Sequence, residues 1–427
     1  MKRFKIERII ENSSFSLPAL LIFGFIIRIL YSILFPVAEL HAPADSFYYD
    51  LSAKGVLFGE GYHELNLYAY RPPLYAFFLS LIYNFFGSFP QSYYHVIFVQ
   101  SIISVLSVYY LYKLALELFN NKIRAFIAAS LYCFFPTFIA LNAEILTEPL
   151  FFSLFIPGFY YSYIGQKKRK IGAVITGAIL FGLSSLTREI TFYFYPLLIT
   201  IFLVFTKTTL RNKIAVSTCM VLGFGAVVAP WMARNYTIFN NPLISTSGGI
   251  NFYMGNNETA TGFFKWKLPE GAIWANNLNA QKVAIDKLHT IEMATNKACY
   301  TAGINFIKDN PNHFLSLTLK KLIFFWLPPT SDLQNLQLTH DSILRVFRLL
   351  FSCIITILGA IGICRALMKR RFSFLLLFVW ILYTTAFHAV VVADHRYSLT
   401  MIPFLCIFTM FPFRSNFSNE KKRIIDI

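Results

Sequence analysis

The chain has 427 residues, of which 56% are hydrophobic and only 14% are charged, against roughly 25% charged residues in an average soluble domain. Its formal net charge is +17, but Lys and Arg lie in short clusters between apolar runs, which is typical of membrane proteins and argues against nucleic-acid binding. The six cysteines follow no pattern typical of a disulfide framework or a CxxC metal site. The composition therefore predicts an all-α, polytopic membrane protein that is embedded in a lipid bilayer.

The first apolar run, at about 17–37, follows a basic segment and lacks a small-residue cleavage pattern. It predicts an uncleaved signal anchor whose N-terminus is cytoplasmic. Arg28 interrupts this run. Because a charge at the centre of a spanning helix costs roughly 2.5–3.5 kcal/mol, we expect Arg28 to face the bundle interior beside a carboxylate of a neighbouring helix.

Nine further apolar runs have about the length that a spanning helix needs, which gives about ten transmembrane helices in total. These runs lie at about 94–117, 125–143, 148–165, 171–187, 190–206, 214–231, 344–364, 372–392 and 398–413. With ten spans, all the basic loops fall on one side, which the positive-inside rule makes the cytoplasm. These loops are 122–124, 167–170, 207–213, 365–371 and the tail at 421–423.

A further apolar run at 74–87 is ambiguous. As an eleventh span it would place the four basic loops between residues 122 and 371 outside, so we predict a helix that lies in or dips into the outer interface. The alternative is that 314–327 also spans and restores the parity. Otherwise 310–327 is expected to be an amphipathic helix at the membrane surface.

This topology divides the chain into three regions. Residues 1–231 are predicted to form a transmembrane module with interfacial helices in a first outer loop at 38–92. Residues 232–343 form a small α/β periplasmic insert, in which the turn-rich stretch 238–264 is expected to contain short strands. Residues 344–427 supply the C-terminal transmembrane helices and a cytoplasmic tail.

The sequence contains no P-loop, zinc-protease or serine-hydrolase motif. Instead, charged residues recur at the outer ends of the predicted helices, where they can converge on one face. They are Asp45, Asp50, Arg71, Glu144, Glu148, Arg188, Glu189, Arg234, Asp394, His395 and Arg396. Charges at a membrane edge point to function by default.

Several of these residues could instead have a purely structural role. Asp45 could cap a helix that starts near Ser46, and Asp50 could be a solvated or structural carboxylate. Arg71 could anchor a turn at the lipid headgroups, and Glu148 could interact with the helix dipole. Arg188 could form a local ion pair with Glu189, and Arg396 could bind a lipid phosphate.

Several short motifs carry a resemblance to a known family. They are RPPL at 71–74, LTEPLF at 146–151, LTRE at 186–189, PWMARNY at 230–236, GGINFYMGNNETATG at 248–262 and HRYSLTMIPFL at 395–405. In this order they resemble bacterial polytopic glycosyltransferases of the GT-C class. The narrower resemblance is to the dolichyl-phosphate-mannose-protein mannosyltransferase-like group, which includes the aminoarabinose transferases.

The resemblance implies a glycosyltransferase of the bacterial inner membrane, with its active site facing the periplasm. Such an enzyme takes a sugar from a polyprenyl-phosphate donor and transfers it to a cell-envelope glycan, lipid or protein. The resemblance assigns the catalytic carboxylate to Asp45 and contacts with the donor phosphate to Arg71 and Arg188. Arg396 is a third candidate for the phosphate, and the supporting candidates for acceptor or metal binding are Asp50, Glu144, Glu148, Arg234 and His395.

The chain departs from the family pattern at two positions. Tyr70 stands where relatives of the aminoarabinose type are acidic, and Ser46 follows Asp45 where the protein-mannosyl type has a second acid. The acceptor chemistry and the need for a divalent metal ion therefore stay open. A membrane transporter or lipid flippase is the alternative function, because charges within helix bundles also line transport paths.

Overall fold

The computed structural model describes residues 16–37, 39–40, 44–206, 208–263, 288–327 and 340–411. Apart from one isolated bridge between Glu64 and Leu67, these residues form helices and connecting turns, which confirms the predicted all-α fold. Within the predicted loops, Lys207 and the basic tail at 421–423 lie outside the described residues.

The helices follow the predicted apolar runs in order. In the N-terminal half they are α2 (Ser16–Leu34), α3 (Asp45–Leu57), α4 (Leu74–Phe86), α5 (Tyr93–Phe119), α6 (Lys122–Cys133), α7 (Pro136–Asn142), α8 (Glu148–Lys168), α9 (Ile171–Ser185), α10 (Ile190–Phe205) and α11 (Leu210–Phe239). In the C-terminal half they are α12 (Ser247–Gly255), α13 (Leu288–Asp309), α14 (Pro311–Trp326), α15 (His340–Met368), α16 (Leu375–Val390), α17 (His395–Ser398) and α18 (Ile402–Phe408).

Four of the described helices are long and apolar enough to cross a membrane: α2, α5, α11 and α15. Helices α6 and α7 together would make a fifth span, bent by 52°. Helices α4, α9, α10 and α16 are apolar but shorter. The chain is thus a multi-pass membrane protein, and the number of ten spans stays a prediction.

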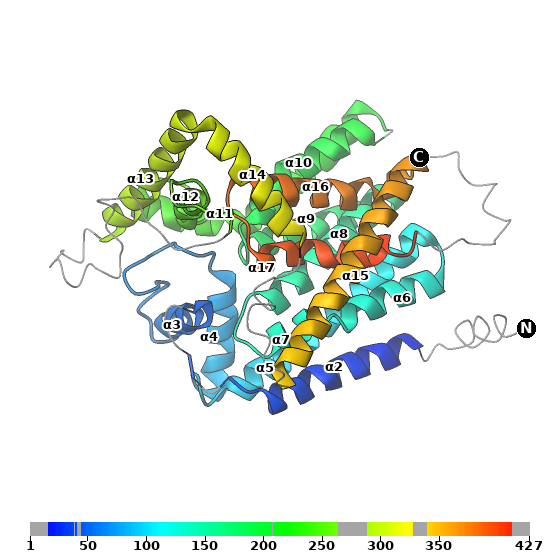
Figure 1. Ribbon diagram of the computed structural model, residues 1–427, viewed down its shortest axis with the longest axis horizontal. Coiled ribbons are helices and arrows are strands. Elements are labelled where there is room, and N and C mark those ends of the chain that lie inside the picture. The colour runs from blue at the N-terminus through cyan, green and yellow to red at the C-terminus, as the bar shows by residue number, and fades with distance from the viewer. Residues whose placement is uncertain are drawn as a thin grey trace, which may run out of the picture.

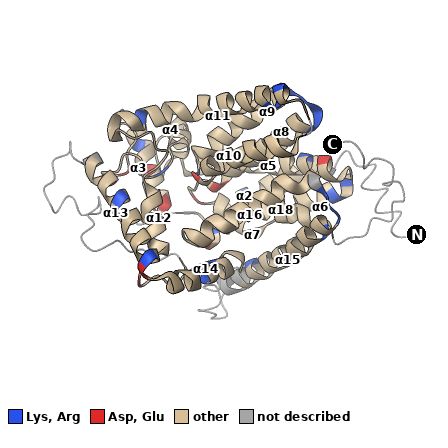
Figure 2. Cartoon of the chain, turned by 90° about the horizontal axis from the view of Figure 1, so that it is seen from above, with Lys and Arg blue, Asp and Glu red and all other residues tan. Residues whose placement is uncertain are grey.

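The relative placement of two basic loops can be read from ion pairs. The ammonium groups of Lys167 and Lys168, at the end of α8, lie 3.0 and 2.8 Å from carboxylate oxygens of Glu117, near the end of α5. Both helices therefore end on the same side. Lys and Arg gather at this end of the molecule, near α6, α8 and α9 (Figure 2). A shared side for these loops is what the ten-span prediction requires.

An aromatic core joins the middle of the chain to its C-terminal helices. The indole of Trp380 on α16 lies 4.5 Å from the ring of Phe155 on α8 and 4.8 Å from that of Phe194 on α10. On α18, the ring of Phe404 lies 4.7 Å from that of Phe159. This packing holds α16 and α18 against α8 and α10.

The environment of Arg28 differs from the expectation. Its buried guanidinium donates to the hydroxyl of Ser104 at 2.9 Å and to the carbonyl oxygens of Gly24 and Cys133 at 2.8 and 3.1 Å. The prediction of a carboxylate partner is therefore wrong. Neutral oxygens of α5, of α6 and of α2 itself accept the hydrogen bonds of Arg28.

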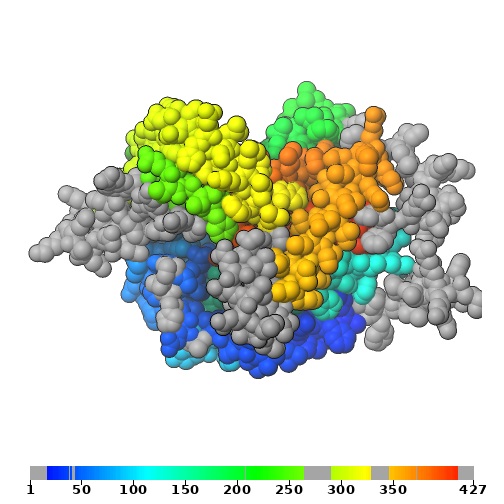
Figure 3. All heavy atoms as spheres, viewed as in Figure 1, coloured from blue at the N-terminus to red at the C-terminus, as the bar shows by residue number. Residues whose placement is uncertain are grey.

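Helices α3 and α4 of the first outer loop and helices α12 and α13 of the insert lie at one end of the molecule, away from α6 (Figure 1). Helix α4 has 13 residues, or about 20 Å at 1.5 Å per residue, against about 30 Å for the hydrocarbon core. It runs across the direction of α2 (Figure 1). Helices α13, α14 and α15 cover one broad face, with α2 along its lower edge (Figure 3).

The insert differs from the prediction in two ways. Between 238 and 263, where short strands were expected, the chain forms the end of α11, turns and helix α12, so that prediction is wrong. The described part of the insert is helical, and the predicted boundaries at 232 and 344 fall inside α11 and α15. Packing of α12 against α13 outweighs the turn-rich composition of this stretch.

Candidate active site

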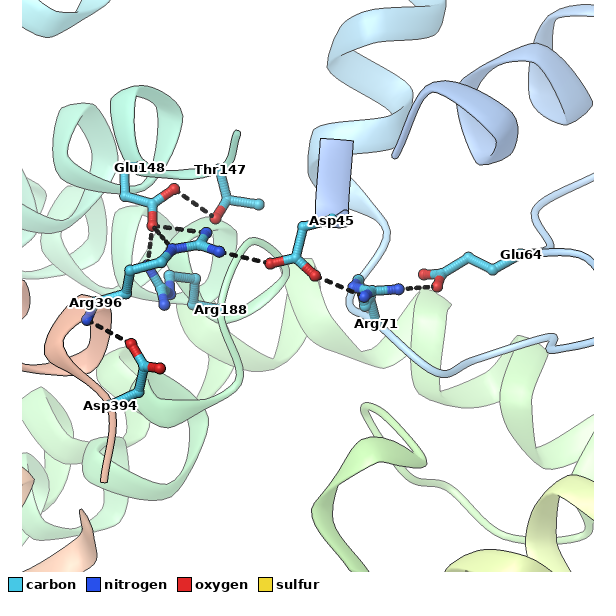
Figure 4. A network of polar contacts seen from close by, with 8 residues as sticks. All are labelled: Asp45, Glu64, Arg71, Thr147, Glu148, Arg188, Asp394 and Arg396. Carbon is cyan, nitrogen blue, oxygen red and sulfur yellow. Dashed lines mark hydrogen bonds and ion pairs between the residues drawn. The ribbon is translucent and has the colours of Figure 1, made fainter. Parts of the chain in front are cut away.

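Asp45 lies at the centre of a row of alternating acidic and basic side chains (Figure 4). One carboxylate oxygen accepts from Nη2 of Arg71 at 2.7 Å, and the other accepts from Nη1 of Arg396 at 2.7 Å. Asp45 is the first residue of α3, and Ala44 occupies the cap position without a side-chain cap bond. The capping role considered for Asp45 is therefore wrong, because its carboxylate is turned towards the two guanidinium groups.

Arg71 is held from several sides. Its Nη1 donates to Glu64, a fully buried carboxylate that also accepts from the hydroxyl of Tyr62 at 3.2 Å. The guanidinium lies over the rings of Tyr70 at 4.9 Å and Tyr48 at 5.0 Å, within range of cation–π attraction. Burial alone would lower the pKa of Arg71, but the nearby carboxylates raise it well above its ordinary value.

On the other side of Asp45, Glu148 joins two arginines. Its Oε1 accepts from Nε and Nη2 of Arg396 at 3.0 and 2.9 Å and from Nη1 of Arg188 at 3.0 Å. The main-chain N–H of Arg396 is fixed by Asp394, whose carboxylate accepts it at 2.8 Å. The local pair of Arg188 with Glu189 is not formed, because Glu189 accepts from Ser245 and Ser247 instead.

The result is a charge-balanced row, in which each arginine bonds to at least one carboxylate. In order it reads Glu64, Arg71, Asp45, Arg396, Glu148 and Arg188 (Figure 4). Burial acts to raise the pKa of Asp45, but the charges of Arg71 and Arg396 outweigh it and lower this pKa to about 2. Asp45 is therefore ionised throughout the physiological range.

Two of the supporting candidates make their contacts outside this row. Asp50 accepts from the hydroxyl of Tyr83 at 2.9 Å and pairs with Lys54 at 2.7 Å, which ties α3 to α4. Arg234 donates to the carbonyl oxygens of Tyr62 and Tyr68 in the first outer loop.

The remaining two supporting candidates lie nearer to the row. Glu144 is exposed in the turn before α8. The ring of His395 lies 5.0 Å from that of Phe263. Among the described residues, no group of three or more His, Cys, Asp or Glu is arranged to hold a metal ion.

A mainly apolar cavity of about 200 Å³ opens beside Arg396. It lies between α7, α14, α15 and the segment 395–405, and Arg348 and His395 are among its polar lining residues. Its apolar lining includes Phe135, Phe325, Trp326, Leu349, Met401 and Leu405. The cavity therefore places an apolar volume next to a guanidinium of the charged row.

Sequence reasoning missed Glu64 and Arg348. A signal existed for Arg348, because an arginine within an apolar run is a site hypothesis by default. Glu64 gave none, since a single Glu in a polar outer loop is usually a solvated residue.

Comparisons with known proteins confirm the GT-C resemblance. A model of the dolichyl-phosphate-mannose-protein mannosyltransferase family matches residues 70–233, a range that includes Arg71, Glu148 and Arg188. No curated protein sequence matches the chain.

Two similar solved structures show the same fold. The first is the archaeal oligosaccharyltransferase AglB from Archaeoglobus fulgidus in complex with an inhibitory peptide and a dolichol-phosphate, at TM-score 0.52 and 15% identity over 93% of this chain. The second is the Archaeoglobus fulgidus oligosaccharyltransferase in the apo form, at TM-score 0.52 and 14% identity over 94% of this chain. The match covers 50% of each archaeal chain.

Proposed function

We propose that the chain is a membrane glycosyltransferase that transfers a sugar from a polyprenyl-phosphate-linked donor to an acceptor on the outer side of the membrane. The observation that carries this proposal is the position of Asp45 between Arg71 and Arg396, with Arg188 bound to the next carboxylate. The site thus combines a carboxylate that could act on the acceptor with several guanidinium groups that could bind a phosphate.

Of the three arginines in the row, Arg188 has the most hydrogen-bond donors left for a phosphate. Within the described residues its side chain donates one hydrogen bond, through Nη1, whereas a guanidinium has five N–H donors. The other two arginines each bond to two carboxylates. A phosphate that enters beside Arg188 would gain donors from it first and would then compete for those of Arg396.

The apolar cavity beside Arg396 supports a lipid-linked donor. Its apolar lining suits a hydrocarbon chain, and Arg396 and Arg348 are among its lining residues. The archaeal structure of the same fold contains a dolichol-phosphate and a peptide, which supports a lipid-linked donor and places protein among the acceptors to be tested, beside envelope glycans and lipids.

The proposed reaction needs both charge types. The acceptor oxygen forms a bond to the anomeric carbon, and the bond from that carbon to the phosphate oxygen breaks. The bonding electron pair leaves with polyprenyl phosphate, whose negative charge the arginines stabilise. The proton of the acceptor hydroxyl passes to Asp45, which acts as general base.

The low pKa of Asp45 makes it a weak base while both arginines pair with it. Binding of the donor phosphate relieves this, because the phosphate takes hydrogen bonds from Arg71 and Arg396 that Asp45 would otherwise accept. The donor would thereby raise the basicity of Asp45 at the moment when the acceptor must lose its proton.

Replacement of Asp45 by Asn tests the proposal. The side chain keeps its size, and Arg71 and Arg396 keep Glu64 and Glu148 as partners, so we expect a folded protein. Loss of a general base lowers rates by typically 10²–10⁴-fold. The measurement is sugar transfer by the purified protein from a polyprenyl-phosphate donor, together with mass spectrometry of envelope glycans in a complemented deletion strain.

The matched control is Asp50→Asn, which removes a carboxylate of the same helix outside the charged row. This variant should stay within several-fold of the wild-type rate. Near-normal turnover by Asp45→Asn would remove Asp45 from the mechanism. Sugar flux into empty liposomes without transfer would favour a transporter instead.

A further inference from the structure

The segment just before Arg71 is held by side chains from two distant parts of the chain. We call residues 62–70 the strap. Arg234, on α11, donates to two of its carbonyl oxygens, those of Tyr62 and Tyr68. Glu292, on α13, accepts from the main-chain N–H groups of Tyr68 at 2.7 Å and Ala69 at 3.1 Å.

Glu292 is only 4% exposed and makes a third bond, in which it accepts from the hydroxyl of Thr246. The N–H of Thr246 in turn donates to the carbonyl oxygen of Ala69 at 2.8 Å. The strap is therefore clamped between the turn before α12 and a buried carboxylate of the insert. Arg71 follows the strap directly, and the hydroxyl of Tyr62 donates to its carbonyl oxygen at 2.8 Å.

We propose that Glu292 is a positioning residue, which fixes the strap from within the insert and thereby sets the position of the Arg71 guanidinium. The consequence for donor binding rests on the function proposed above, whereas the effect on the strap does not. Arg234 completes the clamp, because it holds the carbonyl side of Tyr68 while Glu292 holds the N–H side.

The clamp depends on the ionisation of Glu292. An ionised carboxylate accepts at both oxygens, whereas a protonated one turns one oxygen into a hydroxyl donor that faces an N–H group. Burial raises the pKa of Glu292 to about 7, against the opposing effect of its hydrogen bonds. The charged groups that face it are Glu64 in the strap and Arg234 on α11. The strap should therefore be tightest above pH 7 and loosen below it.

Global stability should respond with the opposite sign. Because the pKa of Glu292 is higher in the folded state than in the unfolded chain, its contribution to stability is present at low pH and is lost as pH rises through about 7. Loosening of the strap at low pH is thus distinct from acid unfolding.

Hydrogen exchange of the strap amides tests the proposal without an activity assay. In the wild-type protein, with rates corrected for intrinsic pH dependence, the amides of Tyr68 and Ala69 should be about tenfold better protected at pH 8 than at pH 6, as expected for loss of one bond to a charged group. In Glu292→Gln, protection should be low and equal at both pH values.

The matched control is Asn296→Ala. Asn296 lies one turn further along α13 and accepts from the N–H of Gly249 on α12 at 2.7 Å, so its loss disturbs the same helix pair without touching the strap. This variant should keep the wild-type difference between pH 6 and pH 8. Equal protection of the wild-type strap at both pH values would overturn the proposal, even if Glu292→Gln failed to fold.

Steady-state kinetics test whether the strap affects the site. At pH 8, Glu292→Gln should raise the KM for a polyprenyl-phosphate donor about tenfold with a smaller change in kcat, and it should lose the pH limb near 7 that the wild type shows. An unchanged donor KM and pH limb would overturn the link to Arg71. A strap that responds as expected in a protein that transfers no sugar would instead contradict the proposed function alone.

Discussion

Arg396 makes the connection that closes the charged row. Its Nη1 reaches Asp45, while its Nε and Nη2 reach Glu148. A guanidinium can do this because its donors point in fixed directions around a plane. A lysine ammonium carries the same charge at one point and cannot span two carboxylates in this way.

We therefore expect Arg396→Lys to lower kcat/KM by about tenfold or more, because the carboxylates that Arg396 bridges lose their common partner. Arg370→Lys is the comparison, since Arg370 lies at the exposed turn after α15, outside the charged row, and a lysine keeps its charge. That variant should stay within about threefold of the wild type. Steady-state transfer kinetics decide between them, and equal effects would contradict the bridging role of Arg396.

The sequence could indicate which charged residues lie near one another, but not how they pair. Glu148 and Arg396 stood out because they are charged residues at predicted helix ends. Their bond joins positions 248 residues apart, and no local pattern records such a pairing. Glu64 and Glu292 were missed for the same reason, since each acts through a partner that only the fold brings near.

The helices explain why the charges meet at one edge. Glu148 begins α8, Asp45 begins α3, and Arg396 lies in α17, so each group stands at a helix end. A carboxylate in the first turn is also favoured by the helix dipole, which fits Asp45 and Glu148 but does not distinguish a structural from a catalytic role. The two carboxylates share one arginine, Arg396, which joins the start of α3 to the start of α8.

Helix periodicity and length made most helices predictable from the sequence, whereas the structure of the insert was not predictable in this way. Apolar runs of about 20 residues predict helices well because the bilayer allows few other structures. In the insert, Gly and Asn suggested strands, but Gly248 and Gly249 lie within α12, where an added Cβ on Gly249 would meet the main chain of Asn296 at 2.1 Å. Close packing of α12 on α13 explains the glycines there.

Cysteine labelling in intact cells tests the arrangement of the helices. In a background without native cysteines, Lys170→Cys, at the exposed turn between α8 and α9, should react only after the membrane is permeabilised. Glu258→Cys, at the exposed turn after α12, should react from outside. The ion pairs of Glu117 with Lys167 and Lys168 place two basic loops on one side, which the positive-inside rule makes cytoplasmic.

External labelling of Lys170→Cys would contradict the ten-span topology, together with the outward-facing site that depends on it. Exclusive labelling of both cysteines from one side would show that the number of spans between them is even.

At the scale of the whole molecule, the site joins segments from both ends of the chain. Asp45 and Arg396 are 351 positions apart, and the aromatic core around Trp380 holds the C-terminal helices against α8 and α10. Each arginine of the row pairs with a carboxylate. Under the proposed function, binding of an anionic lipid would exchange some of these internal ion pairs for contacts with phosphate.

This exchange predicts that a polyprenyl phosphate stabilises the folded protein. A ligand that binds the native state alone adds about 2.7 kcal/mol of stability at a concentration of 100 times its Kd, so the apparent Tm in detergent should rise. The corresponding polyprenol lacks the phosphate and should give a much smaller rise, because the apolar cavity alone cannot use the arginines.

Arg188→Ala should lose most of the rise caused by the phosphate, since this arginine has the most donors left for an anion within the described part of the chain. Arg370→Ala, at the exposed turn after α15 on the opposite end of the molecule, is the control and should respond like the wild type. Equal stabilisation of both variants would place the phosphate away from Arg188. Equal stabilisation by the phosphate and the polyprenol would mean that the lipid chain, and not the charged row, accounts for binding.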